Sequence, residues 1–281
     1  MNHILTSPAI LFTPGNKAKH FQKAEEVGAN GIILDLEDGV SQEEKNKARD
    51  NVIKYLIGLK KRALLTIIRI NQITTEAGLK DVLALRNSEI HYDVLLYPKV
   101  ESSEELFILN SVMQLEQRHI SLVALVETGR GLSQLAGIVS ACPFLKGIIF
   151  GAADYAVNVG CDISWDTLLL SRQQIVQAAA IAQIAAIDCP CFDFENDDIL
   201  KNELLNIKAM GFTGKLAIHP KQIPIIKQGF RPSEEELKEA EVISKTYEKA
   251  GGKACQYQGK MIDLPIYKKS QHIIARAKNT K

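Results

Sequence analysis

Short apolar runs recur along the chain, and each is followed by a turn and a longer amphipathic segment. Several runs carry Val, Ile and Leu at both odd and even positions, which is typical of strands buried on both faces of a parallel sheet. The runs are Ala9–Phe12, Gly31–Leu36, Leu64–Ile70, Val94–Leu96, Leu122–Val126, Gly147–Phe150, Ala185–Ile187 and Leu216–Ile218. The seventh run is the weakest, because it could also close the helix that precedes it.

The segments between the runs are long enough for crossover helices, with apolar residues at steps of three and four. The clearest are Glu43–Leu59, Ser102–Arg118, Thr167–Ile184 and Ile199–Met210. Eight strands that alternate with helices predict an α/β protein with a (β/α)8 TIM barrel. No G-x-G-x-x-G follows the first run, which argues against a dinucleotide-binding fold.

The chain continues past the eighth run. Ser233 in the N-cap position and Glu236 in the capping-box position predict the start of another helix. Gly259–Pro265 is interpreted as a connector before a last amphipathic helix. We therefore expect a barrel over residues 1–230 and a C-terminal helical extension over residues 231–281.

Composition excludes some classes of protein. The 281 residues are 46% hydrophobic and 24% charged with a net charge of +1, so bulk electrostatics suggest neither nucleic acid nor an anionic membrane as a partner. No apolar run approaches the ~18 residues of a membrane span. The five cysteines fit no disulfide framework, and Cys189 and Cys191 lack C-x-x-C spacing. A reduced, cytoplasmic protein is expected.

Active sites of such barrels lie at the carboxyl ends of the strands, so polar residues that end an apolar run are candidates. These are Asp35, Glu37, Asp38, Arg69, Asn71, Lys99, Glu127, Asp154 and His219. Glu127 and Asp154 follow neighbouring runs and could share one Mg²⁺, which commonly takes one or two protein carboxylates. They could equally cap helices.

Arg69 interrupts the apolar run TIIRIN and needs an anion, because an unpaired buried charge is costly. Its partner could be Asp35 or Asp38 in a structural ion pair, or a substrate carboxylate or developing oxyanion. The pattern favours a positioning role for His219 over direct ligation. By pattern alone, the basic residues at positions 17, 19, 23, 45 and 49 belong to solvated helix faces.

Eight motifs in order resemble the citrate lyase β-subunit-like family of the HpcH/HpaI aldolase superfamily, over essentially the whole chain. They are LFTPGN (11–16), ILDLEDGV (33–40), RIN (69–71), PKVES (98–102), VETGRGL (126–132), FGAADYA (150–156), GFTGKLAIHPKQI (211–223) and GKMIDLP (259–265). Departures from the family pattern are Gln72, Gly129 and Lys17, of which the last weakens one expected coenzyme A contact. None removes a proposed catalytic group.

The resemblance implies roles for individual residues. Glu127 and Asp154 would hold Mg²⁺, and Glu127 and Arg69 would bind the substrate. Catalysis would fall to Arg69 and to Asp263, the latter reaching the site of a neighbouring subunit. Contacts with coenzyme A are implied for Phe12, Lys19, Lys23, Lys45, Arg49, His219 and Pro220. A homo-oligomer with shared sites is expected, a trimer being favoured, with the C-terminal extension packed on a neighbour.

The implied activity is Mg²⁺-dependent cleavage of a small 3-hydroxyacyl-CoA thioester, of citramalyl-CoA or malyl-CoA type, to acetyl-CoA and a 2-keto acid or glyoxylate. The same site could run in the synthase direction. Three alternatives stay open: the β subunit of a citrate lyase that acts on citryl-acyl carrier protein, a CoA-independent metal aldolase, and a non-catalytic sensor of coenzyme A or a metabolite.

Overall fold

A computed structural model describes residues 7–59 and 64–279. The chain divides into two compact units, Met1–Ile226 and Lys227–Lys281. The expected boundary after residue 230 coincides with the last residue of a helix that spans both units, α9 (Gln222–Phe230).

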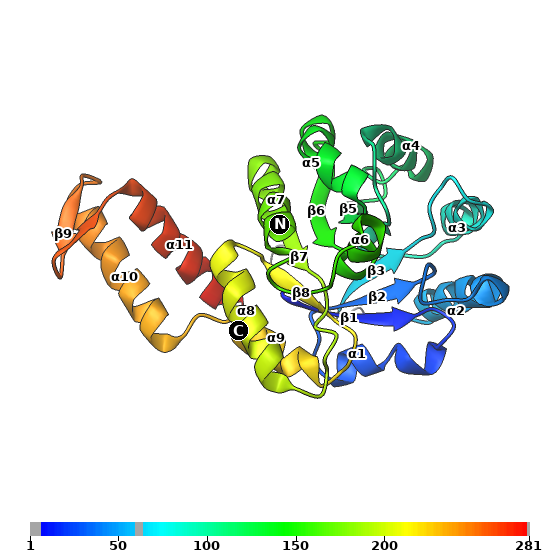
Figure 1. Ribbon diagram of the computed structural model, residues 1–281, viewed down its shortest axis with the longest axis horizontal. Helices are drawn as coiled ribbons and strands as arrows, with labels where there is room; N and C mark the ends of the chain where they lie inside the picture. Colours follow the sequence, from blue (N-terminus) through cyan, green and yellow to red (C-terminus); the bar gives the residue numbers. More distant parts are fainter. Residues whose placement is uncertain (1–6, 60–63, 280–281) are drawn as a thin grey trace. The chain divides into compact units, whose positions relative to one another are not determined.

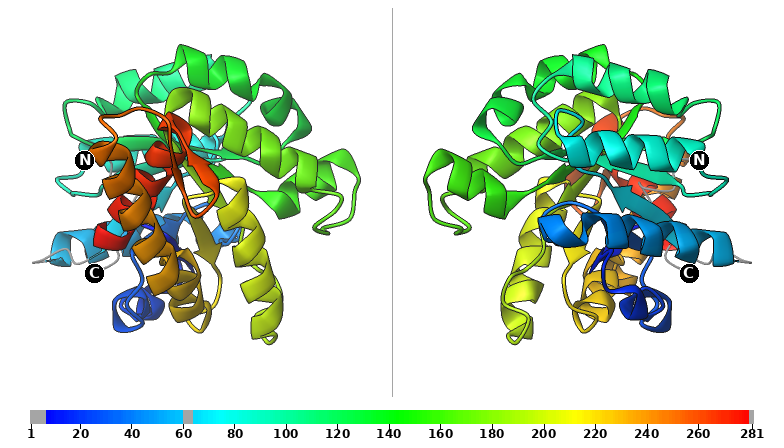
Figure 2. Two further views of the ribbon diagram at one scale, coloured as in Figure 1. Left: turned by 90° about the vertical axis from the view of Figure 1, so that its left-hand side faces the viewer. Right: turned by 90° about the vertical axis from the view of Figure 1, so that its right-hand side faces the viewer.

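Eight parallel strands close into a barrel in chain order, and β1 pairs with β8 (Figures 1 and 2). The strands are β1 (Ala9–Pro14), β2 (Gly31–Asp35), β3 (Leu65–Arg69), β4 (Val94–Tyr97), β5 (Ser121–Val126), β6 (Leu145–Phe150), β7 (Ala185–Asp188) and β8 (Gly214–Ala217). The TIM barrel predicted from the apolar runs is confirmed. The ambiguous seventh run is a strand that pairs on both sides, whereas Ile218, expected in β8, lies outside it and is exposed.

Helices follow the strands around the outside of the barrel (Figure 1). They are η2 (Ala18–His20), α1 (Lys23–Glu26), η3 (Gln42–Glu44), α2 (Lys45–Gly58), α3 (Glu76–Asn87), α4 (Ser103–Met113), α5 (Gly129–Ala141), α6 (Ala152–Val159), α7 (Leu169–Ala182) and α8 (Asp197–Met210). No helix in the described ranges has an apolar stretch that would cross a bilayer.

Alternation along each strand determines which side chains fill the barrel. Ile33 and Ile67 belong to the interior cluster, which also contains Ile10, Val94, Leu96, Val123, Leu125, Ile149, Ala185, Ile187 and Leu216. Two residues after Ile33 and Ile67, the same faces of β2 and β3 carry Asp35 and Arg69, which lie opposite each other in register. The apolar interior therefore ends in charged side chains at the carboxyl ends of the strands.

The C-terminal unit contains α10 (Glu234–Lys249), a hairpin of β9 (Cys255–Tyr257) and β10 (Lys260–Ile262), and α11 (Leu264–Asn279). The capping box of Ser233 and Glu236 at the start of α10 is confirmed. The prediction that Gly259–Pro265 is a connector is wrong, because this segment contains β10 and the first two residues of α11. Gln258 and Gly259 have φ of 49° and 77° and form the two-residue turn, whose left-handed backbone suits a tight hairpin.

Candidate active site

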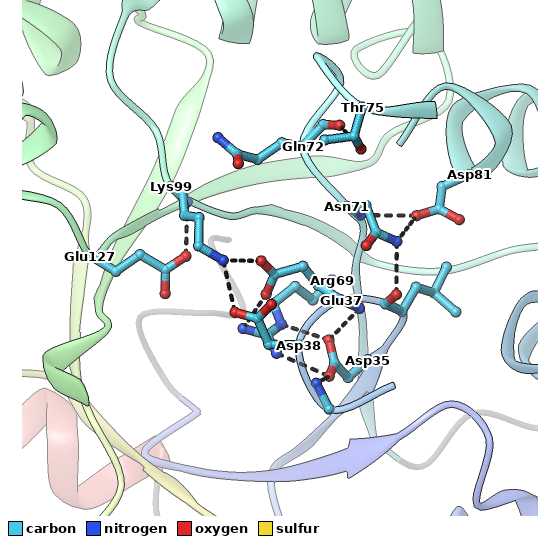
Figure 3. A network of polar contacts seen from close by, with 12 residues as sticks. Asp35, Glu37, Asp38, Arg69, Asn71, Gln72, Thr75, Asp81, Lys99 and Glu127 are labelled. Carbon is cyan, nitrogen blue, oxygen red and sulfur yellow. Dashed lines mark hydrogen bonds and ion pairs between the residues drawn. The ribbon is translucent and has the colours of Figure 1, made fainter. Parts of the chain in front are cut away.

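Arg69 is held by two carboxylates at the carboxyl end of β2. Its Nε and Nη2 donate to Asp35 Oδ1 and Oδ2 at 2.6 and 2.9 Å, and its Nη1 lies 2.8 Å from Glu37 Oε2 (Figure 3). Burial opposes the charge of Arg69, but the attraction and hydrogen bonding of Asp35, together with the attraction of Glu37 and Glu127, outweigh it and raise the pKa. Of the two partners expected from sequence, Asp35 is confirmed, whereas Asp38 gives way to Glu37 because Asp38 faces Lys99 instead.

The ring of Phe12, on β1, completes the surroundings of Arg69. The guanidinium carbon lies 4.6 Å from the ring centroid, a cation–π distance. The guanidinium is thus fixed from one side by a ring and from another by two carboxylates. Such a group needs little reorganisation when an anion arrives.

Glu127 directly follows β5 and is 1% exposed. Its Oε1 accepts a hydrogen bond from the main-chain N–H of Lys99 at 2.9 Å (Figure 3). Burial, followed by repulsion from Glu37, raises the pKa of Glu127 to about 8, and Asp154 adds to this repulsion. The carboxyl group therefore sits where its charge is disfavoured until a cation lies beside it.

Glycine is required beside Glu127. A Cβ at Gly151, the residue after β6, would lie 2.6 Å from both Cβ and Oε2 of Glu127. Asp154 lies three residues later, in the first turn of α6, and is partly buried. The turn from β6 into α6 thus gives Glu127 room and brings the carboxylate of Asp154 to the same end of the barrel.

The donor set fits Mg²⁺. Within residues 7–59 and 64–279 no group of three or more His, Cys, Asp or Glu side chains is arranged to hold a metal. Mg²⁺ needs only one or two carboxylates and takes its other ligands from water or substrate. The pair of Glu127 and Asp154, one buried and one partly open, meets that requirement without soft ligands.

A cavity of about 350 Å³ opens beside this network. Its lining includes Glu37, Asp38, Lys45, Gln72 and Lys99. Lys45 is the first residue of α2, and the other four residues come from the loops that follow β2, β3 and β4. The cavity therefore lies at the catalytic end expected of a barrel.

The expected basic residues lie in different environments. Lys19 and Lys23 are exposed, in the segment after β1. Lys45 donates instead to the main-chain carbonyls of Leu36 and Glu37, at 2.9 and 2.7 Å. Lys45 is therefore not on a solvated helix face.

Arg49 is buried rather than solvated. Its Nε donates to Asp81 Oδ1 at 2.9 Å, and Asp81 Oδ2 accepts from the side chain of Asn71 at 2.7 Å. Neutralising Arg49 would leave Asp81 without its ion-pair partner in the interior, which is costly. Its contact with coenzyme A stays a prediction, but the residue is unsuitable for testing coenzyme A affinity.

The remaining candidates belong to the segment after β8 and to the C-terminal unit. His219 stacks on Phe194 at 5.2 Å, and its Nδ1 accepts the N–H of Lys221 at 3.2 Å; Pro220 is partly buried. In the C-terminal unit, Asp263 Oδ1 accepts the N–H of Ile266 at 3.2 Å and so caps α11.

A second buried ion network escaped the sequence reasoning. Lys215 on β8 is fully buried, with Nζ 2.7 Å from Asp188 Oδ2 and 2.8 Å from Glu203 Oε2. Arg172 donates to the other oxygen of Asp188 at 3.0 Å. The sequence feature that could have predicted this network is a lysine inside the short strand GKLA, opposite the aspartate that ends β7.

Cys189, beside Arg172, is buried, and burial raises the pKa of its thiol to about 12, which fits an inert cysteine.

Comparison with known proteins agrees with this geometry. Residues 9–220 match the model of the HpcH/HpaI aldolase/citrate lyase family, and residues 168–279 match that of a C–C bond lyase of the TIM-barrel fold. Human mitochondrial citramalyl-CoA lyase is 32% identical over 97% of this chain and 86% of its own length. The citrate lyase β subunit of Haemophilus influenzae is 30% identical over 96% of this chain and 97% of its own.

Solved structures give the same assignment. CitE from Mycobacterium tuberculosis, in complex with magnesium, acetoacetate and coenzyme A, is 30% identical with a TM-score of 0.83 over 97% of this chain and 98% of that one. RipC from Yersinia pestis is 37% identical with a TM-score of 0.74 over 83% of this chain and 99% of that one. The chain therefore belongs to the HpcH/HpaI aldolase/citrate lyase family and is a carbon–carbon lyase with a TIM-barrel fold.

Proposed function

We propose that the protein cleaves a small 3-hydroxyacyl-CoA thioester, of citramalyl-CoA or malyl-CoA type, to acetyl-CoA and a 2-keto acid or glyoxylate. The observation that carries this proposal is the buried Glu127 beside Arg69, with Asp154 adding negative charge from α6. When bound by Glu127 and Asp154, Mg²⁺ would supply Lewis acidity toward the hydroxyl and carboxylate of the substrate. Relatives named citramalyl-CoA lyase and malyl-CoA lyase support this substrate class.

Two residues of the protein would carry out the remaining steps of the reaction. Arg69, oriented by Asp35 and Glu37, stabilises the negative charge that develops on oxygen as the carbon–carbon bond breaks. Asp263 donates a proton to the carbon that leaves as the enolate of acetyl-CoA, and removes one in the condensation direction. We propose that Asp263 serves a neighbouring subunit of a homo-oligomer, with a trimer favoured.

A panel of substrates tests the proposed class. Citramalyl-CoA and malyl-CoA are expected to release acetyl-CoA, and citryl-acyl carrier protein is expected to be inert. The second candidate, a citrate lyase β subunit, is favoured by the nearly complete coverage of the Haemophilus influenzae relative. Turnover of the carrier-protein substrate alone would establish that candidate instead.

Affinity for coenzyme A should depend on the exposed lysines after β1. Lys19→Gln and Lys23→Gln are expected to raise KM for the thioester about three- to tenfold and leave kcat within about twofold, because they remove uniform binding only. Steady-state kinetics check this, with Lys54→Gln on α2 as the control. A fall in kcat at constant KM would contradict the assignment. Equal turnover of the free acid and the thioester would favour a CoA-independent aldolase.

A further inference from the structure

Lys99 has an unusual backbone conformation two residues after β4. Its φ is 47°, in the left-handed region that residues other than glycine seldom adopt. In this conformation its N–H donates to Glu127 Oε1 at 2.9 Å, and the following Val100 N–H donates to Leu125 O at 3.3 Å. An outlier of this kind persists only where its surroundings determine it. Here the turn directs one main-chain N–H at the proposed metal ligand.

The side chain of Lys99 crosses to the loop after β2. Its Nζ contacts a carboxylate oxygen of Glu37 and lies 2.7 Å from Asp38 Oδ2, and the side chain is 25% exposed (Figure 3). Burial opposes the charge on Lys99, but the hydrogen bonds to Asp38 and Glu37, together with the attraction of the nearby carboxylates, outweigh it and raise the pKa. Lys99 is therefore cationic, and it joins Glu127 on one side to Glu37 on the other.

Glu37 in turn contacts Arg69, so a continuous set of contacts runs from Glu127 through Lys99 and Glu37 to Arg69. The carboxylates of the site are Asp35, Glu37, Asp38, Glu127 and Asp154. Among the described residues of this network, Arg69 and Lys99 are the cations that form ion pairs with these carboxylates. Lys45 adds positive charge near Asp35 and Glu37, but its Nζ is bonded to the main-chain carbonyls of Leu36 and Glu37. Without Lys99, Arg69 would be the one cation in the described part of this network that forms ion pairs with these carboxylates, so an anionic substrate would meet a more negative site.

We propose that Lys99 is a positioning residue of the active site: its main-chain N–H holds the carboxylate of Glu127, and its ammonium group fixes Glu37 against Arg69 and offsets the acidic group, so that the site accepts a carboxylate next to the metal. This inference rests on the proposed function, in which Glu127 binds Mg²⁺ and Arg69 binds the substrate anion. The main chain and the side chain of Lys99 therefore have different roles. The main-chain N–H orients the carboxylate of the metal ligand, and the ammonium group favours binding of the substrate anion.

Calorimetric titration with Mg²⁺ alone, and then with pyruvate at saturating Mg²⁺, separates these tasks. Lys99→Met keeps the N–H and the length of the side chain but loses the charge. It is expected to bind Mg²⁺ at least as tightly as the wild type and pyruvate about tenfold more weakly. Lys99→Arg, which restores the charge, should recover most of the affinity for pyruvate. Lys47→Met, an exposed lysine in the first turn of α2, is the control and should match the wild type.

The outcomes separate this inference from the proposed function. If the wild type binds no Mg²⁺, the proposed function is overturned and the role of Lys99 with it. If the wild type binds both ligands and Lys99→Met binds pyruvate equally well, only the role of Lys99 is overturned. Equal losses of Mg²⁺ and pyruvate affinity, unrepaired in Lys99→Arg, would also overturn it, since they indicate general structural damage. Lys99→Gln supplies a second neutral side chain if Lys99→Met does not fold.

Discussion

Replacing Glu127 with Gln is expected to abolish Mg²⁺ binding and to lower kcat/KM by about a thousandfold or more, because the charge that attracts the metal is lost. Gln keeps the size of the side chain and an oxygen that accepts the N–H of Lys99, so the barrel should stay folded. Ala at this position would instead leave that N–H without its partner, at a cost of about 1–3 kcal/mol in the free energy of unfolding. The Gln variant therefore separates metal loss from destabilisation.

Calorimetry with Mg²⁺ and thermal unfolding measure these two effects. Asp154→Asn should behave in the same way as Glu127→Gln. Glu116→Gln, the same change at an exposed glutamate in the segment before β5, is the control and should keep both Mg²⁺ binding and turnover. Mg²⁺ binding that survives in the double variant of Glu127 and Asp154 would refute the ligand assignment.

Mixing two inactive variants should restore activity if Asp263 serves a neighbouring subunit. Each shared site needs Glu127 from one chain and Asp263 from the next. A random equal mixture of Glu127→Gln and Asp263→Asn subunits would then hold about a quarter of its sites intact, because the contacts of a cyclic oligomer are heterologous. About a quarter of wild-type activity is therefore expected. Asn can accept the N–H of Ile266 as Asp263 does, so α11 keeps its cap.

The matched control mixes Glu127→Gln with Asp154→Asn. Both residues belong to the barrel of one chain, so exchange of subunits cannot rebuild a site and no activity should appear. If labelled subunits exchange and the Asp263 mixture stays inactive, Asp263 either acts within its own chain or is only the N-cap of α11. Native mass spectrometry of the mixed oligomers measures that exchange and the number of subunits.

The barrel could be predicted from the sequence because each strand is recognised from the pattern of its own residues. Runs such as 122–126 are apolar at every position, and only strands covered on both faces need that pattern. Glu127 and Arg69 could be placed at one end of the barrel because active-site residues follow the carboxyl ends of barrel strands. The capping box at Ser233 was equally readable, since its two partners lie three residues apart.

The partners of charged residues could not be predicted in the same way. Lys99 meets Glu37 across 62 positions, and Arg49 meets Asp81 across 32. Sequence distance says nothing about such contacts, so Arg49 resembled a solvated cation. The hairpin of β9 and β10 was missed for a different reason, because strands of three residues are too short to show alternation.

The buried amine of Lys215 can be used to follow the opening of the barrel. Lys215 lies opposite Ala9, where β8 joins β1 and closes the sheet, and none of its surface reaches solvent. An acylating reagent attacks only a neutral, accessible amine, so it can modify Lys215 only in molecules in which this seam has separated. The rate of acylation at Lys215, mapped by mass spectrometry against exposed lysines, would therefore report local unfolding at the seam without any engineered probe.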